Sequence, residues 1–522
     1  MKTRIKILSF LLVTLLVIGS GCTKDFDTIN TDPNSPSIDL AAPDMLLTNA
    51  IESMTDRVHE IFLGHEMGSC WAQHMAKVQY TDEDRYLPRV AVINNTWSSF
   101  YASSGMDIAT LISIGESTLN DNYRGVGLVL QVYVSSVLTD LFGDIPYTQA
   151  WKGGAAEAIL LPEYDSQADI YADMIAKLDT ANAILDPDGL EISGDILFGN
   201  DIVLWKKFAN SLKLRLLLRE SGKVDVAAKM TEVFNDPDTY PIFESNADNA
   251  ALQYLGSAPN NHPINENRKT RDDHRVSATL INLLYADAAS PDYRVSVYAN
   301  LADGVGDYVG LPNGMLSADA AAFNGNGLAN TSTIGDYFTE ATTPGMLMSY
   351  AELQFIIAEA AVKGYIPGGH AIADSFYKKG IVGSYEQYIS VFPDVLDEVW
   401  RPTFESWGMT DEDIFEYALQ DFKDWGGWWP LDTDDAVALE QIGTQRWVAT
   451  FDQGLQSWFE WRRTGYPALT PAVDGVLGGK IPERVYYPSD EYARNNANVT
   501  AAAAAQGSST SDLLTPVWWD VN

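Results

Sequence analysis

The chain has 522 residues, with 71 acidic side chains against 34 basic ones and a formal net charge of −37. This charge excludes a general nucleic-acid binder, which needs a basic face against phosphate, and a polybasic patch that docks on anionic lipid. Two cysteines exclude a disulfide scaffold and a zinc site made of cysteines alone, whereas a hydrophobic content of 46% is enough for a large folded core.

The N-terminal segment has the pattern of a secretory signal peptide. Three basic residues precede an apolar run over residues 7–18, which is too short for a membrane span of about 20 residues. The run ends at Gly19-Ser20-Gly21-Cys22, which resembles a bacterial lipobox, although Gly19 stands where that motif often has leucine. We expect residues 1–21 to be removed as a signal peptide and Cys22 to carry the lipid. Ordinary signal cleavage, with Cys22 unmodified, is the alternative.

Residues 22–43 are expected to form a lipidated N-terminus and an extended tether. The acidic opening after Cys22 resembles the surface-export tag of Bacteroidetes lipoproteins, and residues 30–43 are rich in Asp, Asn, Ser and Pro. Two or more acyl chains hold a protein firmly on a membrane. The segment therefore predicts a protein that is lipid-anchored to the outer membrane and faces the exterior.

Beyond this tether the hydrophobic pattern is mostly helical. In residues 201–219, Trp205, Phe208, Leu212 and Leu216 recur every three or four residues, which places them on one helical face. A second stripe crosses residues 346–364 and ends at a glycine suited to a helix C-cap. The other predicted helices are 44–62, 65–78, 97–119, 126–141, 165–185, 276–286, 370–390, 411–422 and 436–462. Short turns after many of them predict helical hairpins.

Two long stretches, residues 239–275 and 299–345, lack the helical pattern. Both are rich in Asn, Gly, Asp, Pro and Thr. Irregular segments of this length in a folded protein are usually functional or mobile. We predict them as loops rather than helices.

Tryptophan is concentrated near the C-terminus, where ten of the 14 lie between Trp400 and Trp519. Some of them must belong to the core, because Trp447, Trp458 and Trp461 are spaced along one predicted helix. The others lie in or beside loops, where an aromatic ring can serve a ligand.

The aromatic residues are the candidate ligand-binding residues. Trp425, Trp428 and Trp429 come first, because exposed rings on a glycine-containing loop offer flat apolar faces to sugar rings or peptide side chains. A loop folded onto the core is the alternative. Trp97 and Tyr101 come second, since two asparagines that could serve sugar hydroxyls precede them. Their spacing of four residues also allows them to pack inward together.

Basic residues cluster on the predicted helix 201–219. They are Lys206, Lys207, Lys213, Arg215 and Arg219. An anion-binding face is one interpretation, but we favour internal counter-charges, because Arg215 and Arg219 lie four residues apart and can pair with carboxylates of a neighbouring helix. Arg462 and Arg463, next to a tryptophan, are expected to be structural for the same reason.

One group of residues has the spacing of a catalytic constellation. Glu66, Cys70 and His74 would share one face of a helix, as would suit a thiol nucleophile with its base or a zinc site. We favour a helix that buries Cys70 and gives His74 a local hydrogen bond, since a straight helix leaves no oxyanion site opposite the thiol. No hydrolase, Walker or dinucleotide motif is present, so we expect no enzyme.

No metal or cofactor is expected from the spacing of possible ligands. The remaining histidines, which show no zinc-ligand spacing, are His59, His65, His262, His274 and His370. Aspartates gather at two turns, as Asp186 with Asp188 and as Asp432, Asp434 and Asp435. These are predicted to be solvated turn residues. Calcium at one of them is conceivable, although the spacing of a full calcium loop is missing.

Seven stretches resemble the SusD/RagB family of outer-membrane nutrient-binding lipoproteins, in its SusD-like branch. They occur in the family's order at 138–147 (LTDLFGDIPY), 205–215 (WKKFANSLKLR), 350–361 (YAELQFIIAEAA), 445–447 (QRW), 461–467 (WRRTGYP), 481–484 (IPER) and 517–520 (VWWD). The resemblance implies a mainly α fold with few short strands, in which tetratricopeptide-like helix pairs support a loop-built binding region. It implies one such domain over residues 44–522.

The resemblance also implies a function. The expected protein is a surface-exposed lipoprotein that binds a glycan or an oligopeptide and delivers it to a TonB-dependent, SusC-like transporter. A lipid-anchored glycoside hydrolase with an acid pair, or a helical-repeat interaction scaffold, is the alternative. A surface this negative favours neutral sugars or uncharged to cationic peptides over polyanionic glycans.

Overall fold

The structure is a computed structural model that describes residues 41–153, 158–286, 291–392, 400–425 and 428–521. The signal peptide of residues 1–21, Cys22 and most of the tether lie outside the described residues, so signal cleavage and lipidation stay predictions. The first described helix, α3 (Pro43–His59), begins where the predicted tether ends.

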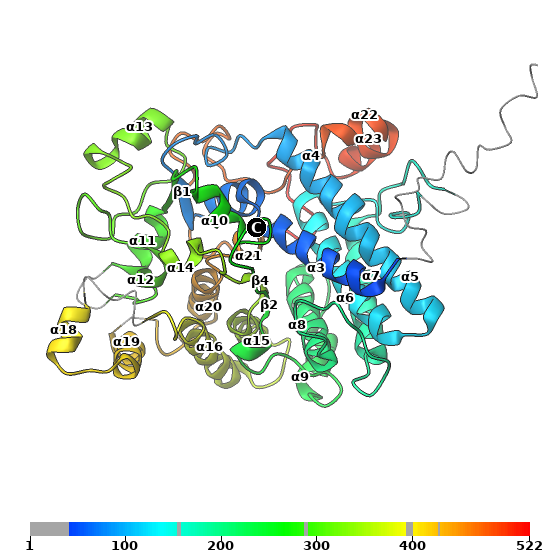
Figure 1. The fold of residues 1–522 in the computed structure, drawn as a ribbon, viewed down its shortest axis with the longest axis horizontal. Helices are drawn as coiled ribbons and strands as arrows, with labels where there is room; N and C mark the ends of the chain where they lie inside the picture. Colours follow the sequence, from blue (N-terminus) through cyan, green and yellow to red (C-terminus); the bar gives the residue numbers. More distant parts are fainter. Residues whose placement is uncertain (1–40, 154–157, 287–290, 393–399, 426–427, 522) are drawn as a thin grey trace, which may run out of the picture.

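The prediction of a mainly α fold with tetratricopeptide-like helix pairs is confirmed. The helices of the N-terminal half, after α3, are α4 (Val90–Ser98), α5 (Gly105–Thr118), α6 (Asp121–Phe142), α7 (Gln167–Ile184), α8 (Ile202–Glu220) and α9 (Ala227–Asn235). Helix α5 packs against α6, α6 against α7 and α7 against α8. These successive hairpins lie side by side in Figure 1.

Local signals fix the ends of the longest helix, α6. The side chain of Asn120 accepts hydrogen bonds from the backbone N–H groups of Asn122 and Tyr123, which would otherwise have no partner at a helix start. The helix ends at Gly143, whose φ of +80° suits glycine. By length and composition α6 could cross a membrane, but 94% of its apolar window is buried inside the protein, as in a core helix.

The C-terminal half repeats this architecture. Its helices are α15 (Tyr350–Val362), α16 (Gly369–Glu386), α18 (Arg401–Ser406), α19 (Asp411–Trp425), α20 (Asp435–Ala449), α21 (Gly454–Thr464), α22 (Ser489–Arg494) and α23 (Asn496–Ala505). Helix α15 packs against α16, α20 and α8, so it joins the two halves. The main hydrophobic cluster extends from Leu47 to Trp519.

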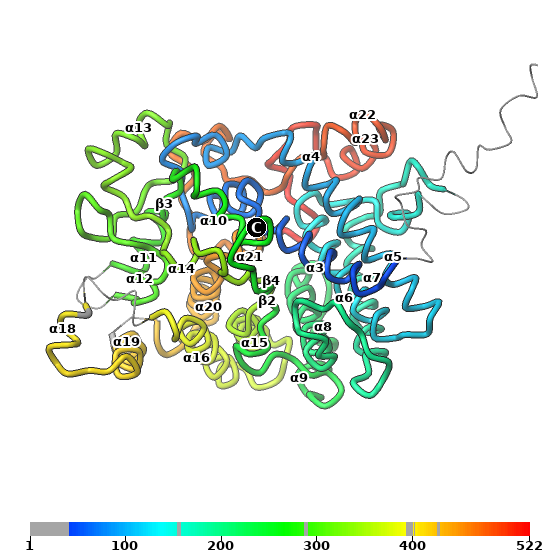
Figure 2. The backbone as a smooth tube through the Cα atoms, in the orientation of Figure 1, coloured from blue at the N-terminus to red at the C-terminus, as the bar shows by residue number. Residues whose placement is uncertain are grey.

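The two stretches predicted as loops form an irregular region between α9 and α15, which Figure 2 shows as long winding segments. Its short helices are α10 (Pro263–Arg268), α11 (Ala278–Leu284), α12 (Val295–Tyr298), α13 (Ser317–Ala322) and α14 (Asp336–Thr339), with 3-10 turns η4 (Asn246–Asp248) and η5 (Phe323–Gly325). Two antiparallel strand pairs are present among the described residues, β1 (Met75–Lys77) with β3 (His274–Val276) and β2 (Ala250–Leu252) with β4 (Gly345–Met348). The β1–β3 pair joins the irregular region to the segment after η2, and the β2–β4 pair joins the two ends of the region.

The continuous helix predicted over 65–78 is wrong. The segment begins within a π-helix, η2 (Ile61–Ser69), turns at Gln73 with a φ of +59°, and continues as β1. A Cβ at Gly68 would lie 2.6 Å from the backbone nitrogen of Leu455, so glycine lets α21 approach η2 closely. The helix predicted over 97–119 is confirmed: the backbone is helical from Trp97 to Thr118, and a second π-helix, η3 (Ser99–Ser104), joins α4 to α5 within it.

The single helix predicted over 436–462 is also wrong, because a turn at Thr450–Gln453 separates α20 from α21. The Thr450 hydroxyl lies 3.0 Å from the carbonyl oxygen of Arg446 and 2.7 Å from the Ser457 hydroxyl. A threonine that bonds to a preceding carbonyl competes with helix continuation. The turn places Trp447 and Trp458 on two different helices.

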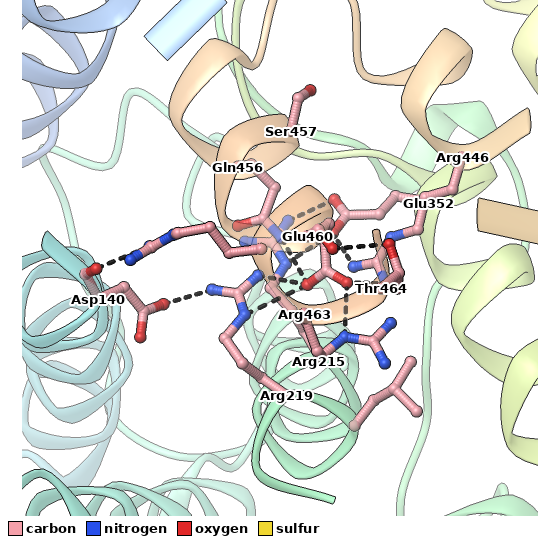
Figure 3. Close-up of polar contacts among 12 residues, drawn as sticks. Asp140, Arg215, Arg219, Glu352, Arg446, Gln456, Ser457, Glu460, Arg463 and Thr464 are labelled. Atoms are coloured by element: carbon pink, nitrogen blue, oxygen red, sulfur yellow. Dashed lines mark hydrogen bonds and ion pairs between the residues drawn. The ribbon is translucent and has the colours of Figure 1, made fainter. Parts of the chain in front are cut away.

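Buried ion pairs connect helices from both halves of the chain, as Figure 3 shows. The Arg215 guanidinium binds Glu352 on α15 through Nε at 2.9 Å and Nη2 at 2.5 Å. Arg219 pairs with Asp140 on α6 and donates to Glu460 on α21 at 2.5 Å. All of these side chains are buried. The prediction that the arginines of α8 serve as internal counter-charges is therefore confirmed.

The same holds for the arginine pair on α21. The Arg462 guanidinium lies 4.1 Å from the ring centroid of Trp458 and donates to the carbonyl oxygens of Glu483 and Asp140. Arg463 forms two hydrogen bonds of 2.6 Å to Glu359. Burial opposes the charge of Glu359, but Arg463 and Lys363 lower its pKa to about 2. Both arginines are structural, as predicted.

Candidate functional site

The C-terminal aromatic candidates are half-buried rather than fully exposed. Trp428 and Trp429 pack against the main core, and the Tyr377 hydroxyl donates to the Trp428 carbonyl oxygen at 2.7 Å. The ammonium of Lys378 lies 5.0 Å from the Trp429 ring centroid. Trp425 ends α19, and its side chain lies outside the described part of the chain. The two described rings thus follow the alternative of a segment that rests on the core, and each retains partial exposure for a ligand.

Trp97 and Tyr101 also pack inward. Trp97 is 8% exposed and contacts the rings of Tyr101 and Phe142 at centroid distances of 4.8 and 5.1 Å. The Tyr101 hydroxyl donates to the Pro146 carbonyl oxygen at 2.6 Å. Both residues nevertheless line a hollow of about 180 Å³ together with Trp151. This volume can accommodate no more than a small group at the end of a ligand.

Glu66, Cys70 and His74 do not form a catalytic face. Glu66 is paired with Lys77, and burial raises the pKa of the Cys70 thiol well above its usual value. His74 Nε2 lies 2.9 Å from the Trp447 carbonyl oxygen, and burial lowers its pKa to about 3. A protonated thiol and a histidine whose Nε2 bonds to the backbone do not make a nucleophile with its base.

The aspartate clusters behave as turn and cap residues. Asp434 accepts hydrogen bonds from the backbone N–H groups of Ala436 and Val437 at the start of α20, and Asp186 accepts one from the Asp188 N–H. These contacts agree with the prediction of solvated turn residues. Calcium at either turn stays a prediction.

Two hollows follow helix α3, and neither was predicted. One has a volume of about 550 Å³ and the other about 680 Å³, and Glu52 lines both. Their opposite walls come from residues 252–255, 258–261 and 263–267 of the irregular region. We call the two hollows together the α3 groove. Their combined length along one helix suits a chain-like ligand better than a compact one.

Carboxyl groups dominate the floor of the α3 groove. Burial and the neighbouring Asp56 raise the pKa of Glu52, and burial raises the pKa of Asp56, whose carboxylate accepts a 2.7 Å hydrogen bond from Tyr254. Burial also raises the pKa of Glu60. Arg57 is the basic residue on the same wall. A ligand that donates hydrogen bonds, or that carries positive charge, would stabilise the charged form of these carboxylates against the cost of burial.

Apolar side chains form the rim of the α3 groove. Met45 is 71% exposed and Leu255 58% exposed, which is unusual for residues of this size. In the second hollow Phe62 contributes an aromatic edge, and the Arg89 guanidinium lies 4.3 Å from its ring centroid. Apolar rims beside hydrogen-bonding floors match the apolar faces and the hydroxyl-bearing edges of a sugar ring.

Sequence reasoning missed the α3 groove because its helical wall has no aromatic or motif signal. The one available signal was the irregular stretch 239–275, which provides the opposite wall. Residues on one face of α3 face solvent there instead of a neighbouring helix. This exposure depends on where the loop passes and not on the composition of α3.

Comparisons with known proteins agree with this architecture. Residues 33–488 match the family model SusD-like_2, described as "Starch-binding associating with outer membrane". A comparison with curated proteins found no match.

Three solved structures are similar over almost their full length. A chitin-binding protein is 27% identical, with 92% of this chain and 100% of that chain covered and a TM-score of 0.75. A SusD homologue from Bacteroides fragilis is 25% identical, with 92% and 99% covered and a TM-score of 0.72. A chitin-binding SusD homologue from Flavobacterium johnsoniae shares the fold at 22% identity, with 92% and 98% covered and a TM-score of 0.69.

Proposed function

The chain belongs to the SusD-like family. We propose that it is an outer-membrane lipoprotein that captures a glycan and delivers it to a TonB-dependent transporter for uptake. The observation that carries the proposal is the family match over residues 33–488, because that family is described as associating with the outer membrane. The lipobox-like segment that ends at Cys22 supports the anchor.

We propose the α3 groove as the glycan site. Its two hollows have volumes of about 550 and 680 Å³, and they combine apolar rims with hydrogen-bond acceptors. Two of the similar structures are chitin-binding proteins, so oligomers of N-acetylglucosamine are the first glycans to test. These oligomers are uncharged, and the net charge of −37 and the carboxylates of the groove favour uncharged ligands over anionic ones.

Binding without turnover is the expected behaviour. Isothermal titration of the mature protein with chitin oligosaccharides should give saturable binding, and chromatography of the same mixture after prolonged incubation should show intact oligosaccharide. Sulfated and uronic-acid glycans serve as controls and should bind at least ten-fold more weakly. Released reducing sugar would favour the glycoside hydrolase alternative. No detectable binding to any glycan or peptide in a screening panel would favour the helical-repeat interaction scaffold.

Removal of the lipidation site should detach the protein from the membrane. In the Cys22→Ser variant we expect the protein in the soluble fraction, because the thiol that accepts the lipid is gone. The wild-type protein should stay in the outer-membrane fraction and co-purify, in mild detergent, with a large β-barrel receptor. Cys70→Ser is the matched control and should leave the location unchanged. A Cys22→Ser protein that still fractionates with membranes would contradict the lipobox.

A further inference from the structure

Three buried side chains from distant parts of the chain meet behind the α3 groove. His59 is the last residue of α3, His262 directly precedes α10, and Asp452 lies in the turn between α20 and α21. Their exposed fractions are 2%, 0% and 8%. His59 Nδ1 lies 3.6 Å and His262 Nε2 lies 3.7 Å from Asp452 Oδ2, and the three atoms all lie within 4.8 Å of one another.

These atoms lack hydrogen-bond partners. Within the described part of the chain, His59 Nδ1, His262 Nε2 and both carboxylate oxygens of Asp452 are buried and have no group at hydrogen-bond distance. Burial of a carboxylate without such a partner is unfavourable, so it calls for another source of stabilisation.

The spacing fits a metal ion better than a hydrogen bond or a water molecule. The distances of 3.6 and 3.7 Å exceed the range of hydrogen bonds. A water bonded at about 2.8 Å to two atoms this far apart would subtend an angle of about 80°, which is too narrow for its lone pairs and protons. The donor atoms of a tetrahedral zinc ion, with bonds of about 2.0–2.1 Å, lie about 3.4 Å apart.

The surroundings prepare His59 for coordination. Its Nε2 lies 3.1 Å from the Met346 carbonyl oxygen, which can only accept, so Nε2 carries the ring proton and Nδ1 presents a lone pair toward Asp452. A ligating histidine commonly makes this contact with its other nitrogen.

Coordination of a metal ion by His262 requires one change in the hydrogen bonds of its ring. Its Nδ1 accepts a long hydrogen bond of 3.3 Å from the Ile264 N–H. Coordination through Nε2 places the ring proton on Nδ1, so this weak contact would be given up. His65 is also buried beside the cluster, and its ring packs edge-on against His262 at a centroid distance of 6.2 Å.

We propose that His59, His262 and Asp452 bind one divalent transition-metal ion of the zinc class. Two imidazole nitrogens and one carboxylate oxygen are the donor set of zinc and its neighbours, whereas calcium and magnesium require mostly oxygen ligands. The ion would join α3 to the segment around His262. The neighbours Asn261 and Pro263 line the α3 groove, so the ion would fix one wall of the proposed glycan site.

The test uses Co²⁺ and Zn²⁺ alone as probes. The full mature protein, purified with a histidine-free tag and dialysed against chelator, should bind one equivalent of Co²⁺ with visible absorption bands of a tetrahedral site. Zn²⁺ should abolish the bands and raise the melting temperature by several degrees. The variants H59Q, H262Q and D452N should each lose both effects. H74Q, which removes a buried histidine outside the cluster, should keep them.

These metal-binding measurements test the proposed metal site without any glycan, so their result is independent of the proposed glycan binding. Absence of cobalt bands and of a zinc-induced shift in the wild-type protein overturns the proposal, and so does their persistence in D452N and H262Q, which would place the ion elsewhere. If these variants fold poorly, X-ray absorption at the zinc edge of the wild-type protein decides. A shell with at least two imidazoles and short bonds of about 2.0–2.1 Å supports the site, and an all-oxygen shell refutes it.

Discussion

Glu52→Arg should weaken the binding of chitin oligosaccharides about 10- to 100-fold and leave the folded structure intact. Glu52 lines both hollows of the α3 groove and is half-buried, so its carboxylate can accept hydrogen bonds from ligand hydroxyls in either one. A hydrogen bond to a charged group contributes about 1.5–3 kcal/mol, which corresponds to the stated loss of affinity. An arginine at this position also occupies the space between the hollows.

Two controls locate the effect. Glu405→Arg makes the same change of charge at an exposed position on α18, outside the groove, and should keep wild-type affinity. Trp428→Ala combined with Trp429→Ala tests the aromatic site expected from sequence. If that double variant loses affinity while Glu52→Arg keeps it, the ligand binds beside α19 and the groove assignment is wrong. Calorimetry gives the affinities, and circular dichroism shows that each variant is folded.

Glu460→Gln should lower the free energy of unfolding by about 3–5 kcal/mol, the range expected when one partner of a buried ion-pair network is removed. Glu460 accepts hydrogen bonds from Arg219 at 2.5 Å, Arg446 at 2.8 Å and Arg463 at 2.9 Å, as Figure 3 shows. Burial opposes its charge, but these three arginines hold the pKa of the carboxyl well below its usual value. A neutral amide at position 460 removes one negative charge from the network, so the three buried guanidinium groups keep fewer carboxylates to balance their positive charge.

Denaturation by guanidinium chloride measures this loss as a shift of the unfolding midpoint. Glu412→Gln, at an exposed position of α19, should stay within about 0.5 kcal/mol of the wild-type protein. A loss below 1 kcal/mol in Glu460→Gln would show that Arg219, Arg446 and Arg463 find sufficient partners elsewhere.

The ion-pair network should also weaken in acid. The contribution of Glu359 to stability, with its pKa lowered from 4.5 to about 2, is complete above about pH 5 and disappears as the pH falls toward 2.

Much of the scaffold could be predicted from sequence because its helices carry local signals. Helix α8 has its apolar stripe and an aspartate cap at Asp201, and α15 has a serine cap at Ser349. The pairing of Arg215 and Arg219 with carboxylates followed from their charge and spacing, since a buried guanidinium requires a counter-charge. The predictions that failed were continuous helices through Gln73 and Thr450, where a left-handed backbone and a side-chain hydrogen bond end the helical pattern.

The candidate sites were predicted less well than the scaffold. Trp428 was chosen for its place in a predicted loop and Trp97 for the two asparagines before it, but the burial of a ring depends on what packs over it. The α3 groove arises because residues 252–267 pass beside one face of α3 without covering it. No local pattern in α3 distinguishes an uncovered face from a covered one.

The charge of −37, the mainly α class, the expected lipid anchor at Cys22 and the need for internal carboxylates beside the arginines of α8 all follow from the sequence alone. Which distant residues meet depends on how the segments pack in three dimensions. His59 and Asp452 lie 3.6 Å apart because a turn of four residues interrupts the predicted helix 436–462 and brings the carboxylate into the core. Periodicity reports which face of a segment is buried, whereas a binding site depends on which segments those faces are buried against.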